Sequence, residues 1–154
     1  MNNLNGTIYG ATMGVSKAGL GEAGGDAAKF QTSATYEYMI DGIFYAQSAQ
    51  SALAFSTGMD ALAAGDVCLF GVWAAKTAGD IITNQGDVIL AADLAAGLEA
   101  LPYPPVVDDR CLVGLIRVEA GTAAFTPRTT DLGAGGITDT YYDCGVMPSK
   151  MLTA

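Results

Sequence analysis

The clearest hydrophobic pattern in the chain lies in residues 35–47, TYEYMIDGIFYAQ. From Tyr36 to Ile40, large apolar residues occupy every second position, which is the period of a strand with one buried face and one mixed face. Asp41-Gly42 then supplies two residues that tolerate positive φ and suit a two-residue turn. The pattern predicts an antiparallel β-hairpin.

Two longer apolar runs predict buried strands. They are DVCLFGVWAA at 66–75 and CLVGLIRVEAG at 111–121, and both are rich in β-branched and large apolar residues. KTAGD at 76–80 reads as a turn into a further strand within DIITNQGDVIL. TAAFTP at 122–127 is expected to pair back on the second run across Gly121, as a hairpin.

The stretch FTPRTTDLGAGGITDTYYDCGVMPS, residues 125–149, crowds hydroxyl, carboxyl, phenol and thiol groups together. Thr129, Thr130 and Asp131 are residues that hydrogen-bond locally to a turning backbone. GAGG at 133–136 supplies the conformational freedom for a reversal, and ITDTYYDCGV is expected to form the last strand. The crowding therefore favours a turn between strands over a catalytic loop.

The best helical candidate is LAADLAAGLEAL, residues 90–101. Its leucines at 90, 94, 98 and 101 lie near one helical face, Gly97 weakens the pattern, and PYPP ends it.

These elements predict a mainly β fold: an antiparallel β-sandwich or a jelly-roll or barrel-like single domain with one short helix. The sequence shows seven or eight short strands, with turn signals at intervals of about 8–12 residues. Residues 1–30 contain seven glycines and follow neither a strand nor a helix period. We therefore expect an extended N-terminal arm over 1–30 and a β-rich domain over 31–154.

Charge and hydropathy restrict the partners. The net charge of −9 and the absence of a Lys/Arg cluster argue against nucleic acid and against acidic membrane surfaces. No window holds the roughly 18 uninterrupted apolar residues of a membrane span. The mean hydropathy is nevertheless +0.32, so surplus apolar surface is expected to face other protein chains.

Catalytic chemistry has little support. The chain has no histidine, which removes Ser-His-Asp and Cys-His catalysis and histidine-based zinc sites. Gly19 to Gly24 spells G-x-G-x-x-G, but no buried strand precedes it and no βαβ unit follows, so it is assigned to the arm. Asp139 and Asp143 share one face of a strand and could help hold calcium, although no calcium-loop motif supports this. We expect no enzymatic activity, no cofactor and no metal.

The three cysteines are an odd, widely spaced set, and no signal peptide is evident, so synthesis in a reducing cytoplasm is expected. Cys68 and Cys111 lie in apolar strand patterns and are expected to be inert core residues. Cys144 follows Asp143, whose charge should raise the pKa of the thiol.

Five segments carry a resemblance to a known group: TYEYMIDGIFYAQSA, LEALPYPP, VGLIRVEAG, FTPRTTDL and the final VMPS. At these segments, over residues 35–149, the chain resembles small structural proteins of tailed bacteriophages, in particular head decoration or capsid-stabilising (cement) proteins. Arg128 stands where the pattern of that group has glycine. The resemblance implies a virion component on the capsid exterior, made in the host cytoplasm, that contacts the major capsid protein and copies of itself, with a homotrimer favoured.

Candidate contact residues are the aromatic and methionine side chains Tyr9, Met13, Phe30, Trp73, Tyr141, Tyr142 and Met147. An alternative function is a tail- or fibre-associated module that binds glycans or a host surface. It is based on Trp73, the tyrosines and the hydroxyl-rich C-terminal stretch.

Overall fold

The computed structural model describes residues 12–24 and 26–145, and over this part the chain is mainly β, as predicted, with 44% of residues in strands and 4% in helix. The strands are β1 (Met13–Gly14), β2 (Leu20–Glu22), β3 (Phe30–Thr32), β4 (Tyr36–Ile40), β5 (Ile43–Gln47), β6 (Gln50–Leu53), β7 (Asp66–Ala75), β8 (Ile81–Gln85), β9 (Ile89–Leu90), β10 (Arg110–Ala120) and β11 (Ile137–Asp143). The single helix, α1, spans Ala91–Ala95.

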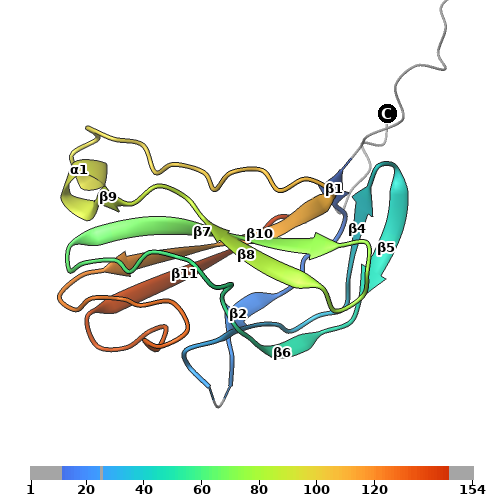
Figure 1. Cartoon of the computed structure of the whole chain (residues 1–154), viewed down its shortest axis with the longest axis horizontal. Helices are drawn as coiled ribbons and strands as arrows, with labels where there is room; N and C mark the ends of the chain where they lie inside the picture. Colours follow the sequence, from blue (N-terminus) through green and yellow to red (C-terminus); the bar gives the residue numbers. More distant parts are fainter. Residues whose placement is uncertain (1–11, 25, 146–154) are drawn as a thin grey trace, which may run out of the picture.

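The strands form three antiparallel sheets (Figure 1). The large sheet has the order β11-β10-β7-β8, and β9 pairs with one end of β7. Two three-stranded sheets, β1-β4-β5 and β2-β3-β6, accompany it. Figure 1 shows β4 and β5 standing across the end of the large sheet.

The two predicted buried strands, β7 and β10, are confirmed and lie side by side at the centre of the large sheet. Their register runs from Asp66 opposite Ala120 to Ala75 opposite Arg110, with one irregularity between Leu112 and Gly114. β7 is buried at every position after Asp66, because both faces of the sheet are covered. This explains why its sequence reads as a continuous apolar run.

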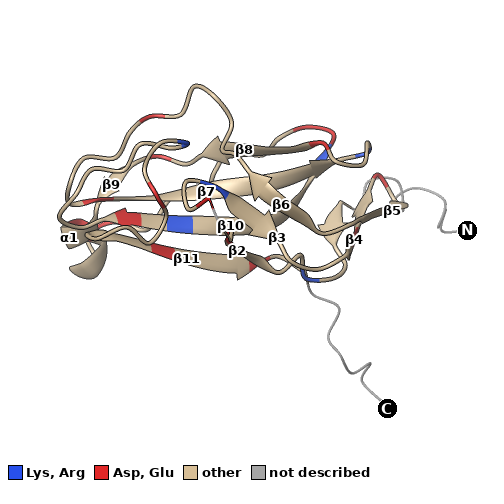
Figure 2. Cartoon of the chain, turned by 90° about the horizontal axis from the view of Figure 1, so that it is seen from below, with Lys and Arg blue, Asp and Glu red and all other residues tan. Residues whose placement is uncertain are grey.

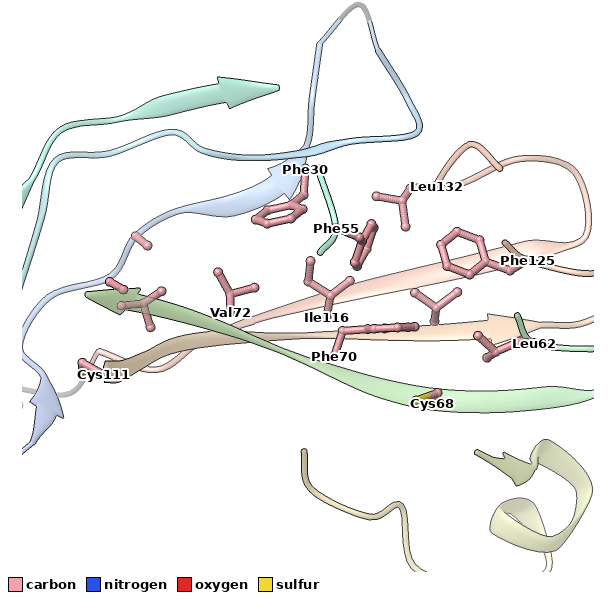
Figure 3. Close-up of a cluster of buried hydrophobic side chains, with 14 of the residues drawn as sticks. Phe30, Phe55, Leu62, Cys68, Phe70, Val72, Cys111, Ile116, Phe125 and Leu132 are labelled. Atoms are coloured by element: carbon pink, nitrogen blue, oxygen red, sulfur yellow. The ribbon is translucent and has the colours of Figure 1, made fainter. Parts of the chain in front are cut away.

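One face of β7 carries the main core, which is built around four phenylalanines (Figure 3). The ring of Phe55 lies 5.5 Å from Phe30, 5.1 Å from Phe70 and 6.0 Å from Phe125, measured between ring centroids. The last two of these pairs are edge-on, as is the pair Phe70–Phe125, and this is a geometry that aromatic quadrupoles prefer. The cluster brings together β3, β7 and two loops far apart in the sequence.

The predicted hairpin over 35–47 is confirmed. Ile40 pairs with Ile43, and Asp41 and Gly42 between them have φ of 53° and 78°. Both central residues thus have positive φ, as a type I′ turn requires. Tyr36, Tyr38 and Ile40 are buried, which is the face that the alternation predicts.

The predicted helix over residues 90–101 is wrong beyond residue 95. α1 has only five residues and none of them is buried. Gly97 has φ of +69°, and the N–H groups of Gly97 and Leu98 donate to the carbonyls of Leu94 and Asp93, which closes the helix in a Schellman motif. The leucine pattern therefore does not form a packed helical face, and Leu98 is 74% exposed.

The predicted pairing of TAAFTP with the strand before it is also wrong. β10 pairs instead with β11, from Gly114 opposite Asp143 to Ala120 opposite Ile137. The intervening segment leaves the sheet, and Phe125 forms an isolated bridge with Leu62. This bridge places the Phe125 side chain in the core.

The described part of the predicted arm, residues 12–24 and 26–30, is integrated into the β domain. β1 pairs with β4, β2 pairs with β3, and Ala18, Ala23 and Phe30 are buried. The strands here have only two or three residues, too short to produce a visible period. Residues 1–11 of the arm lie outside the described residues. In the described part of the chain, no helix has the length and apolar character to cross a membrane.

Candidate interaction surfaces

Two of the predicted contact residues are core residues. Phe30 has no exposed surface, and Trp73 is 5% exposed. Their side chains are covered within the chain itself, so in this structure they offer almost no surface to another chain. Tyr9 and Met147 lie outside the described residues.

The remaining three candidates lie at or near the surface. Met13 on β1 is 50% exposed and Tyr142 on β11 is 45% exposed. Tyr141 points the other way and packs against the core cluster. Burial, followed by the nearby Asp139 carboxylate, raises the pKa of Tyr141 well above its usual range, so it stays a neutral phenol.

The β1-β4-β5 sheet presents an apolar outer row. Met13 lies opposite Met39, and Met39 lies opposite Phe44, so the three side chains are neighbours on one face across three strands. Phe44 is 63% exposed, and Ile43, at the tip of the hairpin, is 58% exposed. We call Met13, Met39 and Phe44, together with Ile43 at the turn on the other face of the sheet, the hairpin patch.

A second apolar surface follows the extended segment at residues 98–109, which we call the strap. The strap covers the face of β7 opposite the phenylalanine core. Asn84 holds it: its Oδ1 accepts a 2.6 Å hydrogen bond from Trp73 Nε1, and its Nδ2 donates one of 2.5 Å to the carbonyl of Pro105. The outward side of the strap exposes Leu98, Tyr103 and Val106, the last at 82%.

Two surface hollows of the described chain are lined in part by polar side chains. One is lined by Glu22, Asp26 and Asp131, together with backbone of the β2–β3 connection. The other lies beside the end of β8, where Thr83 and Gln85 are already hydrogen-bonded to Ser56 and Asp60. Figure 2 shows that acidic residues are spread over many elements of the chain.

Two sites were considered from the sequence, a calcium site at Asp139 and Asp143 and a dinucleotide-binding motif at Gly19 to Gly24. The described residues build neither of them. Among residues 12–24 and 26–145, no three His, Cys, Asp or Glu side chains are placed to hold a metal ion. The Asp143 carboxylate accepts hydrogen bonds from the backbone N–H groups of Gly19 and Leu20, at 2.9 and 3.1 Å. The first glycine of G-x-G-x-x-G thus helps to anchor the β2 strand, and the next element after β2 in the described chain is the strand β3.

The thiols are poorly suited to nucleophilic chemistry. Cys68 and Cys111 are buried, as predicted, and burial raises the pKa of each to about 11. Cys144 is half-buried, and its pKa is raised by burial first and by the Asp143 charge second. All three are therefore protonated near neutral pH, and the protonated thiol is a weak nucleophile.

Sequence reasoning missed the exposed side chains of the hairpin patch and the strap. It placed Ile43 and Phe44 in a hairpin strand but gave no reason for them to face solvent. The apolar pair Ile43-Phe44 directly after the two-residue turn was the available signal, because a hairpin tip projects beyond the core.

Comparison with known proteins adds no relative. No family model matches the chain, and neither the curated proteins nor the solved structures contain a match.

Proposed function

We propose that this chain is a noncatalytic structural protein of a tailed-phage virion, which decorates or stabilises the capsid through repeated contacts with the major capsid protein and with copies of itself. The proposal rests on the resemblance of residues 35–149 and on one observation in particular: the chain places large apolar side chains on two surfaces outside its own core.

The hairpin patch and the strap carry this observation. Phe44, Tyr103 and Val106 are 63%, 73% and 82% exposed, although the chain has a well-filled core of its own. Isolated exposed apolar residues are common, but a row across three strands and a strap of such residues are typical of surfaces that meet another protein. Their aromatic content is also typical of interface centres.

The chemistry of the described residues supports a noncatalytic role. Burial raises the pKa of the thiols of Cys68 and Cys111 and of the phenols of Tyr36, Tyr38 and Tyr141. Active sites usually combine a cleft with groups whose pKa values are shifted toward the working pH. The raised pKa values of these thiols and phenols lie further from neutral pH than their ordinary values.

The glycan-binding alternative loses its main support. A sugar platform needs an exposed aromatic ring, and Trp73 is buried with its Nε1 bonded to Asn84. A glycan array with wild type and Trp73→Phe keeps this alternative testable, because saturable binding that the variant abolishes would restore it.

The capsid proposal is tested on particles that lack this protein. We expect cryo-microscopy to show missing density on the capsid exterior, and we expect the particles to lose stability to heat or chelator. Adding the purified chain should restore both. Unchanged capsid density and unchanged stability would overturn the capsid role, and density missing from the tail would move the protein to that part of the virion.

A further inference from the structure

The strand β5 is an open edge of the β1-β4-β5 sheet. Its inner side pairs with β4 along its whole length, from Tyr36 opposite Gln47 to Ile40 opposite Ile43, with no irregularity. No other described strand pairs with its outer side. Figure 1 shows β5 at the outer margin of the molecule, beyond β4.

The hairpin register fixes which backbone groups face outward. Ile40 and Ile43 flank a two-residue turn and therefore form a hydrogen-bonded pair, and such pairs alternate along an antiparallel ladder. Residues 43, 45 and 47 then bond inward to β4. The N–H and C=O groups of Phe44 and Ala46 point to the open side, where both residues are exposed.

The other sheet edges in the described chain are protected, and β5 is not. β8 is covered by Ser56, whose Oγ accepts from the Thr83 N–H, and β11 carries Asp139 and Asp143. β6 is distorted at Ala52, which has φ of 57°, and β1 and β2 have only two and three residues. β5 has the sequence IFYAQ, with no charge, proline, glycine or bulge, and natural proteins rarely leave such an edge unpaired.

We propose that the open edge of β5 pairs with β5 of a second copy of this chain. In an antiparallel arrangement centred on Tyr45, Phe44 lies opposite Ala46 of the second copy, and Ala46 lies opposite its Phe44. Both N–H and both C=O groups on each side then find partners, four hydrogen bonds in all, because a two-fold axis makes the edge complementary to itself. The three-stranded sheets of two copies become one continuous six-stranded sheet.

Side chains and charge fit the same register. Each Phe44 ring lies beside the small Ala46 of the other copy, which adds a second cross-strand neighbour on the side away from Met39. The two Tyr45 rings, each already stacked on Tyr38 at 5.8 Å between centroids, become neighbours across the axis. The strand itself is uncharged, and the nearby Asp41 carboxylate is paired with Lys76 at 2.9 Å, so two chains of net charge −9 do not oppose like charges at this contact.

The β5 pairing specifies one of the contacts in the proposed function, the contact between copies of this chain. It does not require a virion, so the capsid role and the β5 pairing can be overturned independently. A chain that dimerises through β5 yet never joins particles would overturn the capsid role alone. A chain that joins particles yet stays monomeric in solution would overturn the β5 pairing alone.

The test is sedimentation velocity of the full chain over a series of protein concentrations around the micromolar range, where small interfaces dissociate. We expect wild type to shift from monomer to dimer as the protein concentration rises. Ala46→Pro removes one outward N–H per chain, two of the four hydrogen bonds, and should weaken dimerisation by about tenfold or more. Phe44→Lys should act in the same direction, and Val106→Lys, an equal charge change on the strap, should leave the dimer unchanged.

A cross-link tests the register. Tyr45→Cys brings two thiols together across the axis, at a Cα separation of about 4.5 Å that a disulfide can bridge. We expect a disulfide-linked dimer under mild oxidation, and none from Val106→Cys. Circular dichroism shows whether each variant folds. A folded wild type that stays monomeric, or a dimer or trimer that Ala46→Pro and Phe44→Lys both leave intact, would overturn the proposal.

Discussion

The hydroxyl of Tyr38 donates a 2.6 Å hydrogen bond to the carbonyl of Ala75, and this buried contact joins the β1-β4-β5 sheet to the end of β7. Tyr36, two residues earlier on the same face of β4, buries a hydroxyl that has no partner among the described residues. The two tyrosines are fully buried neighbours whose ring centroids lie 5.8 Å apart. The hydroxyl of Tyr38 is hydrogen-bonded, whereas that of Tyr36 has no partner among the described residues.

This difference predicts opposite effects of the same substitution. Tyr38→Phe removes the bond to Ala75 and should lower the free energy of unfolding by about 1 kcal/mol. Tyr36→Phe removes a buried polar group that makes no bond, so it should be neutral or stabilising by up to about 1 kcal/mol. Urea unfolding of both variants measures the contrast. Equal losses in the two variants would mean that the Tyr36 hydroxyl has a partner, such as a buried water.

The buried thiols should make the fold sensitive to alkali. Cys68 and Cys111 have pKa values of about 11 in the folded chain, above the ordinary value of 9.0. Between pH 9 and 11 the unfolded chain therefore releases thiol protons that the folded chain keeps, so stability is intact below pH 9 and falls as pH rises. We expect a loss of up to about 1.4 kcal/mol per pH unit for each thiol.

The measurement compares unfolding free energies at pH 8 and pH 10 in wild type, Cys68→Ala and Cys111→Ala. This window lies below the range in which the tyrosines, with an ordinary pKa of 10.0, contribute most. Each variant should lose less stability than wild type over the window, even where its stability at pH 8 is lower. A variant with the wild-type pH dependence would show that its thiol does not titrate differently on folding.

Gly71 on β7 sets the distance between the large sheet and the strap. A methyl group at this position would lie 2.5 Å from Trp73 Nε1, 2.6 Å from Asn84 Oδ1 and 3.2 Å from Pro104 Cγ. Gly71→Ala must therefore disturb the Trp73–Asn84 hydrogen bond and the strap, and should cost about 1–3 kcal/mol. Trp73 is the only tryptophan of the chain, so its fluorescence emission reports the change directly.

Gly21→Ala is the matched control, because a methyl group on Gly21 in β2 meets nothing within 4 Å. It should leave tryptophan emission unchanged and stability within about 0.5 kcal/mol of wild type. If Gly71→Ala behaves like this control, the strap is not packed on β7 as the structure has it.

The accuracy of the sequence predictions depends on how far apart in the sequence the interacting residues lie. The β4–β5 hairpin was predictable because Asp41-Gly42 and the alternation around it are local signals. β7 and β10 were predictable because burial on both faces leaves a continuous apolar run. The pairing of Phe125 with Leu62, 63 positions earlier, has no local signal, and TAAFTP was assigned to the wrong partner.

Exposure was harder to predict than secondary structure. Phe30 lies in a glycine- and alanine-rich segment, and nothing near it in the sequence indicates that its ring packs on Phe55. The open side of β5 depends on the order of strands in a sheet whose third member, β1, comes from the predicted arm. Local patterns predict hairpins, but the edge of a sheet is a property of its whole strand order.

Asp143 should hold the segment before β2 against β11. Its carboxylate accepts the backbone N–H groups of Gly19 and Leu20, residues more than 120 positions away. Hydrogen bonds to a charged acceptor contribute roughly 1.5–3 kcal/mol, and nothing else described accepts from these two N–H groups. In Asp143→Ala we expect amide hydrogen exchange at Gly19 and Leu20 to accelerate by about tenfold or more.

Asp139→Ala is the control for this exchange experiment, since Asp139 lies two strand repeats away on the same face of β11 and is the same residue type. Loss of a negative charge alone would accelerate or slow exchange similarly in both variants, whereas loss of an acceptor acts only in Asp143→Ala. Asp143→Asn keeps one acceptor oxygen and should fall between wild type and Asp143→Ala. Wild-type exchange in Asp143→Ala would contradict the anchoring role, and the segment before β2 would then be held by the β2–β3 ladder alone.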